Sequence, residues 1–135
     1  MATFTKINSF VENLAEKAID LSGAALTIAL TNTAHTSTWD ELADLTEISY
    51  TNCSSRVITV STSAQTSGTY KLVCADLVLT ASGAVPEFRY VYIYDDDSTG
   101  DKLIAYYDRG SGLTMADTDT FTVDFNASTG VLTVA

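Results

Sequence analysis

The stretch from Phe88 to Phe125 alternates apolar and polar residues at a period of two, and this pattern constrains the fold more than any other feature. Successive side chains of a β-strand point to opposite faces, so the alternation predicts short strands separated by turns of Gly, Asp and Ser. One face of the first strand would carry four aromatic residues, namely Phe88, Tyr90, Tyr92 and Tyr94. We therefore expect a β-sandwich or β-barrel with very little helix.

Size and charge narrow the class of protein. The chain has 135 residues, a length typical of one domain, and we expect a single domain over residues 1–135. Its 17 acidic and 7 basic residues give a net charge of −10, which would repel a phosphate backbone, so we expect no nucleic-acid partner. No apolar run reaches the roughly 18 residues that would cross a bilayer, so we expect no membrane association. The N-terminus lacks the basic and apolar regions of a signal peptide, which predicts synthesis in a cytoplasm.

One helix is expected near the start of the chain. Ser9 and Glu12 have the spacing of a capping box, in which each side chain accepts a hydrogen bond from a backbone N–H of the first turn. Apolar residues then recur at helical spacing as far as Leu21, which predicts an amphipathic helix with one face on the sheet. Gly23 is expected to end the helix in a left-handed conformation.

Other strands are expected at Ala25–Thr31, Arg56–Thr62 and Tyr70–Thr80, where apolar residues again recur at every second position. The last hairpin is expected to pair Thr120–Asn126 with Val131–Val134 across a turn that contains Gly.

Two aromatic features each have two interpretations. Thr38 and Glu41 repeat the capping-box spacing, which predicts a short helical turn, and Trp39 beside them would be either a plug over one end of the sandwich or an exposed contact anchor. The tyrosine strand is apolar on both faces, so it is either buried on both sides or covered by another subunit. We prefer the plug and the buried strand.

The acidic loop after the tyrosine strand contains the best candidate for a binding site. Asp95, Asp97 and Thr99 have the spacing of the first three oxygen donors of a calcium loop, and Gly100 occupies the position of its sharp turn. Tyr106 stands where the bidentate glutamate would be needed, so the loop lacks its strongest ligand. A solvated turn in which Asp side chains bond to their own backbone is the preferred interpretation, and no metal site is predicted.

No combination of residues predicts catalysis. His35 is the only histidine and has no partner in the sequence pattern, so a surface position is preferred over a general base. Cys53 and Cys74 lack the spacing of a zinc or redox site, so we expect buried thiols, with a disulfide as the alternative outside a reducing compartment. We therefore expect neither enzyme activity nor a cofactor.

A resemblance to a known family is carried by several strand and turn segments, namely Phe88–Asp95, Leu103–Asp108 with Gly110 and Ser111, Phe121–Phe125, Gly130–Leu132, Phe10–Glu12, Leu14–Lys17, Leu26–Asn32 and Leu42–Ile48. Together they cover most of the chain and resemble a family of small virion proteins from tailed bacteriophages. Within that group the most similar role is a capsid decoration, or cement, protein. The resemblance implies a mainly β chain that forms an antiparallel, jelly-roll-like β-sandwich with one N-terminal amphipathic helix.

The resemblance also implies partners and contacts. A decoration protein would sit in the virion on the outer surface of the capsid, bind the major capsid protein and form a dimer or trimer. Phe4 and Ile7 in the N-terminal segment would supply contacts, together with Trp39, Tyr92 and Tyr94. One alternative is a tail or baseplate component that contacts host surface polysaccharide through the tyrosines and Trp39. A second alternative is a small carbohydrate-active or metal-dependent enzyme.

Overall fold

The predicted alternation is realised as three antiparallel sheets. The computed structural model describes residues 2–22 and 25–135. Within those residues the elements are β1 (Phe4–Lys6), α1 (Phe10–Ala15), β2 (Leu26–Thr31), the 3-10 helix η1 (Leu42–Asp44), β3 (Val60–Thr66), β4 (Thr69–Cys74), β5 (Leu77–Thr80), β6 (Val85–Asp95), β7 (Lys102–Met115), β8 (Thr120–Val123) and β9 (Leu132–Val134). No helix in this part of the chain is long and apolar enough to span a membrane. The prediction of a mainly β chain with antiparallel pairing is confirmed.

The tyrosine strand β6 lies inside the largest sheet, whose strand order is β1-β7-β6-β2. The second sheet has the order β3-β4-β9, and β5 pairs with β8 in a separate two-stranded ladder. All of these pairs are antiparallel. The strands that follow each other along the chain from β3 to β4 and from β6 to β7 are hairpin neighbours, whereas β1, β8 and β9 pair with strands far away in the sequence.

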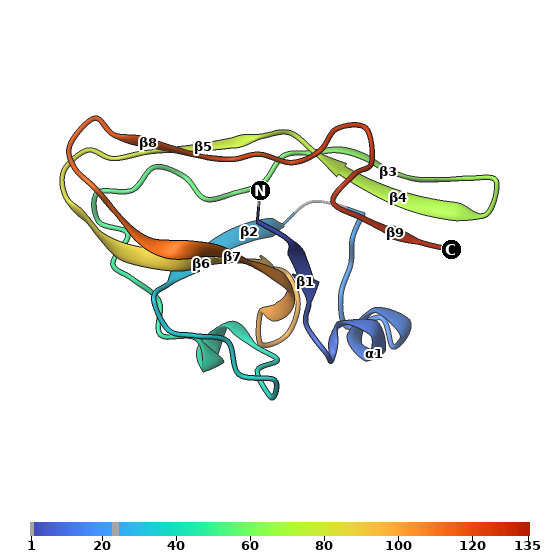
Figure 1. Cartoon of the computed structure of the whole chain (residues 1–135). Helices are drawn as coiled ribbons and strands as arrows, with labels where there is room; N and C mark the ends of the chain where they lie inside the picture. Colours follow the sequence, from blue (N-terminus) through green and yellow to red (C-terminus); the bar gives the residue numbers. More distant parts are fainter. Residues whose placement is uncertain (1, 23–24) are drawn as a thin grey trace.

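Both faces of the four-stranded sheet are covered. Figure 1 shows the β5–β8 ladder and the β3–β4–β9 sheet on one side of it, and η1 with its flanking connection on the other side. Val91 and Ile93 of β6 lie opposite Leu30 and Ile28 of β2, and all four are buried. Tyr92, on the alternate face, is also buried, and its hydroxyl contacts His35 of the connection. The preferred interpretation of the tyrosine strand, burial on both sides, is confirmed.

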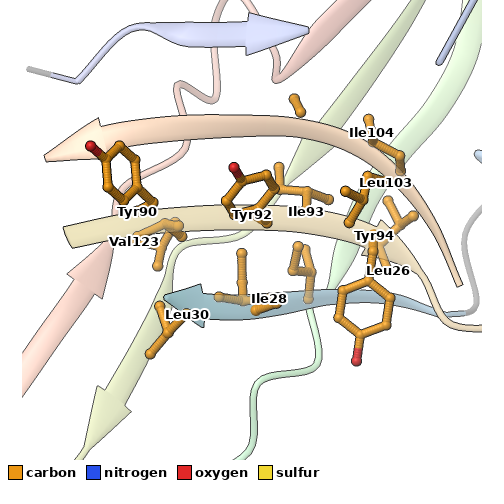
Figure 2. Close-up of a cluster of buried hydrophobic side chains, with 14 of the residues drawn as sticks. Leu26, Ile28, Leu30, Tyr90, Tyr92, Ile93, Tyr94, Leu103, Ile104 and Val123 are labelled. Atoms are coloured by element: carbon orange, nitrogen blue, oxygen red, sulfur yellow. The ribbon is translucent and has the colours of Figure 1, made fainter. Parts of the chain in front are cut away.

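Figure 2 shows how this core is built from three neighbouring strands. Tyr90 and Tyr92 lie along one part of β6, and Leu103 of β7 lies beside Tyr94 at the other, while Ile28 and Leu30 of β2 lie along the opposite edge of β6. Burying an aliphatic or aromatic side chain of this size contributes about 1.5–3 kcal/mol relative to leaving it exposed. The tyrosine strand therefore supplies a large part of the apolar area that holds the layers together.

A bulge separates Phe88 from the tyrosines that follow it. The register of β6 against β7 shifts between Phe88, which pairs with Leu113, and Tyr90, which pairs with Asp108. Gly110 lies in the extra length of β7 with φ of +89°, a conformation that glycine adopts without steric cost. The Phe88 ring then packs edge-on against Phe121 of β8, with their centroids 5.2 Å apart. Gly110 thus lies inside the long strand β7.

The N-terminal helix is present but shorter than predicted. α1 ends at Ala15, and Lys17 already has φ of +66° in the left-handed region. Ser9 precedes the helix without capping it, because its hydroxyl donates to Asp40 Oδ1 at 2.5 Å instead. The capping box at Ser9 and Glu12 was therefore wrong, and Gly23 lies outside the described residues. The second helical turn is confirmed as η1, although its N-cap is Glu41.

Three of the predicted strand assignments differ from the structure. The strand expected at Arg56–Thr62 begins only at Val60 and continues to Thr66 as β3. The segment Tyr70–Thr80 is interrupted after Cys74 and forms β4 and β5, which belong to different sheets. The last hairpin was wrong, because β8 pairs with β5 and β9 pairs with β4. Asp76 Oδ1 accepts the N–H of Phe125 at 2.9 Å, which fixes the crossing of the chain from one sheet to the other.

A matched pair of valine substitutions tests this account of the core. Val85 in β6 is 1% exposed, whereas Val78 in β5 is 50% exposed. We expect Val85→Ala to lower the free energy of unfolding by about 2 kcal/mol, because it removes buried methyl groups and leaves a cavity. Val78→Ala should change it by no more than about 0.5 kcal/mol. Urea unfolding followed by tryptophan fluorescence measures both, and equal effects of the two substitutions would contradict the layer assignment.

Candidate functional site

An aromatic cluster lies between the four-stranded sheet and the connection that covers it. The His35 ring stacks on the Tyr106 ring, with centroids 4.4 Å apart and planes at 24°. Trp39 meets His35 edge-on at 5.7 Å, and Tyr92 stacks on Tyr106 at 5.3 Å. Such offset and edge-on pairs add about 0.5–1.5 kcal/mol each beyond the area they bury. The cluster therefore fastens the connection to the sheet.

A polar network holds the same connection a few residues further along, just before η1. Lys102 of β7 donates to Asp40 Oδ2 at 2.6 Å and to Glu41 Oε1 at 2.7 Å. Asp40 Oδ1 accepts from Ser9 at 2.5 Å and from Asn13 at 2.7 Å. Burial alone would raise the pKa of Asp40, but the hydrogen bonds from Lys102, Ser9 and Asn13 outweigh it and hold this pKa below its ordinary value. The connection is thus fixed to both α1 and β7.

A shallow polar groove opens beside the aromatic cluster. It is lined by residues of β1, β6, β7 and the connection, namely Ala2, Thr3, Thr5, Ala34, His35, Tyr90, Tyr106 and Asp108. Asp108 forms a two-pronged ion pair with Arg89, with N–O distances of 2.7 and 2.9 Å. The hydrogen bond from Arg89 lowers the pKa of Asp108, so the carboxylate stays charged at neutral pH. Aromatic faces, threonine hydroxyls and a fixed carboxylate in one groove suit a ligand that has both ring faces and hydroxyls.

His35 is positioned by an aromatic hydroxyl rather than by a carboxylate. Its Nδ1 lies 3.0 Å from the Tyr92 hydroxyl. Burial lowers the pKa of His35 and raises that of Tyr92, so both groups stay neutral near pH 7. No carboxylate is hydrogen-bonded to His35 among the residues that the structure describes. The histidine is half-buried in the cluster, which differs from the surface position that the sequence favoured.

An apolar cavity of about 400 Å³ lies on the opposite face of the sheet. Phe4 of β1, Val91 of β6 and Tyr107 of β7 form its floor, and side chains of β8 and the following segment, including Phe121, Val123 and Phe125, form its roof. The Phe4 and Tyr107 rings meet edge-on at 5.9 Å. Burial raises the pKa of Tyr107 to about 12. The cavity is large enough for a bulky apolar side chain or a small ligand.

The five predicted contact residues differ in how far the structure buries them. Ile7, Tyr92 and Tyr94 are buried in the core, so their prediction as contact residues was wrong. The reason is that the connection from β2 to β3 covers the tyrosine face, while Ile7 packs inward with its N–H bonded to Ile104 O at 3.0 Å. Trp39 is half-buried against the aromatic cluster, as the plug interpretation expects. Phe4 is half-buried and remains accessible from the apolar cavity.

The acidic loop forms a turn that bonds to its own backbone. Asp95 is buried, and its two carboxylate oxygens accept the N–H groups of Asp97 at 3.1 Å and Asp20 at 2.9 Å. Asp97 and Thr99 are exposed, so the three candidate calcium ligands do not point into one space. No group of three or more His, Cys, Asp or Glu side chains within residues 2–22 and 25–135 is arranged to hold a metal ion.

The two cysteines are free thiols rather than a disulfide. Cys74 is buried, and burial raises its pKa to about 11. Burial also raises the pKa of Cys53, which is half-buried. Both thiols are therefore poor nucleophiles at neutral pH.

Sequence reasoning missed the stacking of His35 on Tyr106 and the groove beside it. The one available signal was that Arg89 and Asp108 are oppositely charged residues on neighbouring predicted strands. The comparisons with known proteins add nothing to this picture, because no family model, curated protein or solved structure matches the chain.

The half-buried position of His35 predicts a pH dependence of stability. Its pKa is lowered from 6.5 by burial, so below about pH 6.5 the unfolded chain binds more protons than the folded chain. The free energy of unfolding should therefore fall between about pH 7 and pH 5, above the range in which the carboxylates titrate. His35→Gln should remove this slope, and urea unfolding at a series of pH values measures it. Identical slopes for the variant and the wild type would contradict the assignment.

Proposed function

We propose that the chain is a structural protein of a tailed-bacteriophage virion and decorates the outer surface of the head. In this proposal it is synthesised in the host cytoplasm and then docks on the major capsid protein. Its layers are proposed to form a jelly-roll-like β-sandwich. The stacking of the β5–β8 ladder and the β3–β4–β9 sheet over the four-stranded sheet supports that architecture (Figure 1). The role is supported by the resemblance of the strand and turn patterns and by the following surface.

The observation that carries the proposal is an open sheet edge beside the apolar cavity. β1 is the outer strand of the four-stranded sheet and, within residues 2–22 and 25–135, pairs with β7 alone. The Ile7 N–H bonds toward β7, so the alternation of an antiparallel ladder directs the backbone groups of Phe4 and Lys6 outward. The Phe4 side chain lines the cavity next to this edge. A capsid segment would add along β1 as a further strand and place an apolar side chain in the cavity.

Such a contact would combine two kinds of interaction that are each modest. Backbone hydrogen bonds along a three-residue edge contribute about 1 kcal/mol each at most. Burial of an apolar side chain in the cavity adds about 1.5–3 kcal/mol. A decoration protein that contacts several capsid subunits makes its second contact at a high effective concentration, so modest contacts suffice for stable attachment.

A second candidate function is favoured by the polar groove at His35, Tyr106 and Asp108. Aromatic faces next to hydroxyls and a fixed carboxylate are the groups that bind sugar rings and their hydroxyls. This arrangement supports the alternative of a tail or baseplate component that contacts host surface polysaccharide. The two candidate functions use opposite faces of the four-stranded sheet, so they can be tested separately.

Phe4→Asp tests the first proposal. The charge would lie against the apolar cavity, so we expect a large fall in the number of copies per virion relative to the major capsid protein. Val11→Asp, on a helix side chain that is 51% exposed, makes the same change in charge away from β1 and should leave the copy number unchanged. Quantitative mass spectrometry of virions assembled with each variant measures this. Unchanged attachment of the Phe4 variant, or a wild-type copy number typical of tail components, would contradict the proposal.

Tyr106→Ala tests the second candidate function. The substitution removes the ring on which His35 stacks and one wall of the groove. If the groove binds sugars, the affinity for host surface polysaccharide should fall by about tenfold or more, because a stacked ring contributes about 1–2 kcal/mol. Phe4→Asp should leave this affinity unchanged. Absence of binding by the folded wild type, measured by titration calorimetry, would eliminate this candidate.

A further inference from the structure

The hairpin of β3 and β4 presents a second open edge. Figure 1 shows this hairpin extending beyond the four-stranded sheet. Ser67 and Gly68 form its two-residue turn with φ of +52° and +84°, as in the type I′ turns that match the twist of a hairpin. β3 is an outer strand of the order β3-β4-β9. Its other edge therefore faces away from the sheet.

The register of the hairpin fixes which backbone groups face outward. Thr66 pairs with Thr69 next to the turn, so this pair and the alternate pair of Ala64 with Lys71 exchange hydrogen bonds within the hairpin. The N–H and C=O groups of Ser63 and Gln65 then point to the open edge. No backbone hydrogen bond joins these two residues to another strand among the residues that the structure describes. The regular part of the edge ends at the bulge between Val60 and Thr62.

Beyond the bulge, residues 62–66 of this edge carry none of the features that block strand addition. Natural edge strands carry charged side chains or proline, or are very short. β3 has seven residues, with the sequence VSTSAQT, and contains neither a charged residue nor a proline. Most of its side chains are exposed. The edge is therefore available to another strand.

The charge distribution indicates which partner this edge fits. No Asp or Glu occurs between Val57 and Ala75 or between Phe125 and Ala135, although the chain has 17 acidic residues. Lys71 is the one charged side chain in the β3–β4–β9 sheet, and its Nζ donates to Ser128 O at 3.0 Å. Two copies with a net charge of −10 each repel one another over most of their surface. At this sheet they can approach without bringing side-chain carboxylates together.

We propose that a second copy of the chain docks on β3 through antiparallel pairing of the two β3 strands. The two-fold axis passes beside Ala64, so that Ser63 of one copy lies opposite Gln65 of the partner subunit and the reverse. This register uses only the regular residues 62–66 between the bulge and the turn. The small Ala64 side chains face each other across the axis without a clash. The two three-stranded sheets then form one continuous sheet of six strands.

This inference is independent of the proposed function, because it concerns the β3 edge and not the β1 edge. The contact is a strand edge with little apolar area, so we expect a weak, concentration-dependent dimer. Sedimentation velocity of the full chain at concentrations up to about 1 mM detects dimers of this strength.

Charge substitutions at the axis test the dimer. Ala64→Asp and Ala64→Lys each place two like charges directly opposite one another, so each should raise the dissociation constant by about fivefold or more. An equimolar mixture of the two variants should dimerise at least as well as the wild type, because opposite charges then face each other. Val78→Asp, which makes the same change in charge on the exposed face of β5, should leave the dimer unaffected. Circular dichroism establishes that each variant is folded.

The outcomes separate this inference from its rivals. A wild-type chain that stays monomeric at about 1 mM would overturn it. A dimer that survives both Ala64 substitutions, or whose variants do not recover when mixed, would assign self-association to another surface and would also overturn it. Neither result bears on attachment to the head, which the copy number of the Phe4 variant measures.

Discussion

Burial of the tyrosine strand on both of its faces is the constraint on which the rest of the structure depends. One face of β6 needs the β5–β8 ladder and the β3–β4–β9 sheet, and the other needs the irregular connection after β2. Irregular backbone covers a core only when its polar groups are satisfied. Backbone bonds do this here: the Leu103 N–H donates to Asp40 O at 2.9 Å, and the Leu42 N–H donates to Asp101 O at 3.0 Å. The aromatic stack at His35 and the Lys102–Asp40 ion pair then fasten the side chains of the same stretch to the sheet. The order of the layers and the position of the aromatic cluster thus both follow from the need to bury the two faces of β6.

The sequence predicted those parts of the fold that depend on local periodicity. The strand at Leu26–Thr31 and the part of β6 from Phe88 to Asp95 follow from alternation alone, as does the burial of the tyrosines, whereas the start of β6 at Val85, before Pro86, does not. Ser9 is the N-cap of α1 as predicted, but the predicted capping bond is absent because Asp40, distant in the sequence, accepts the hydrogen bond of the Ser9 hydroxyl. The last hairpin failed because the choice of partner for β8 and β9 is made by packing between layers, which local pattern does not encode. The stacking of His35 on Tyr106 could not be predicted for the same reason, because it joins segments that are distant in the sequence. Phe4 could be named as a candidate because it is an apolar residue outside the predicted helix.

The two open edges differ in chemistry, and this difference suits two kinds of partner. The β1 edge is short, carries Lys6 and adjoins an apolar cavity, so it fits a partner that supplies both a strand and an apolar side chain. The β3 edge is longer and uncharged, and its sheet contains no acidic side chain, so it fits another copy of the same acidic chain. A subunit that binds the capsid through its β1 edge and a second copy through its β3 edge would link two neighbouring binding sites on the capsid. Several weak contacts of this kind resist separation together.

Cryo-electron microscopy of the virion tests the central claim most directly, because it locates each subunit and its contacts at once. The account predicts density for this fold on the outside of the head, with the β1 edge and the apolar cavity against a major capsid subunit. Density only in the tail or baseplate, with the polar groove directed toward the host, would contradict it.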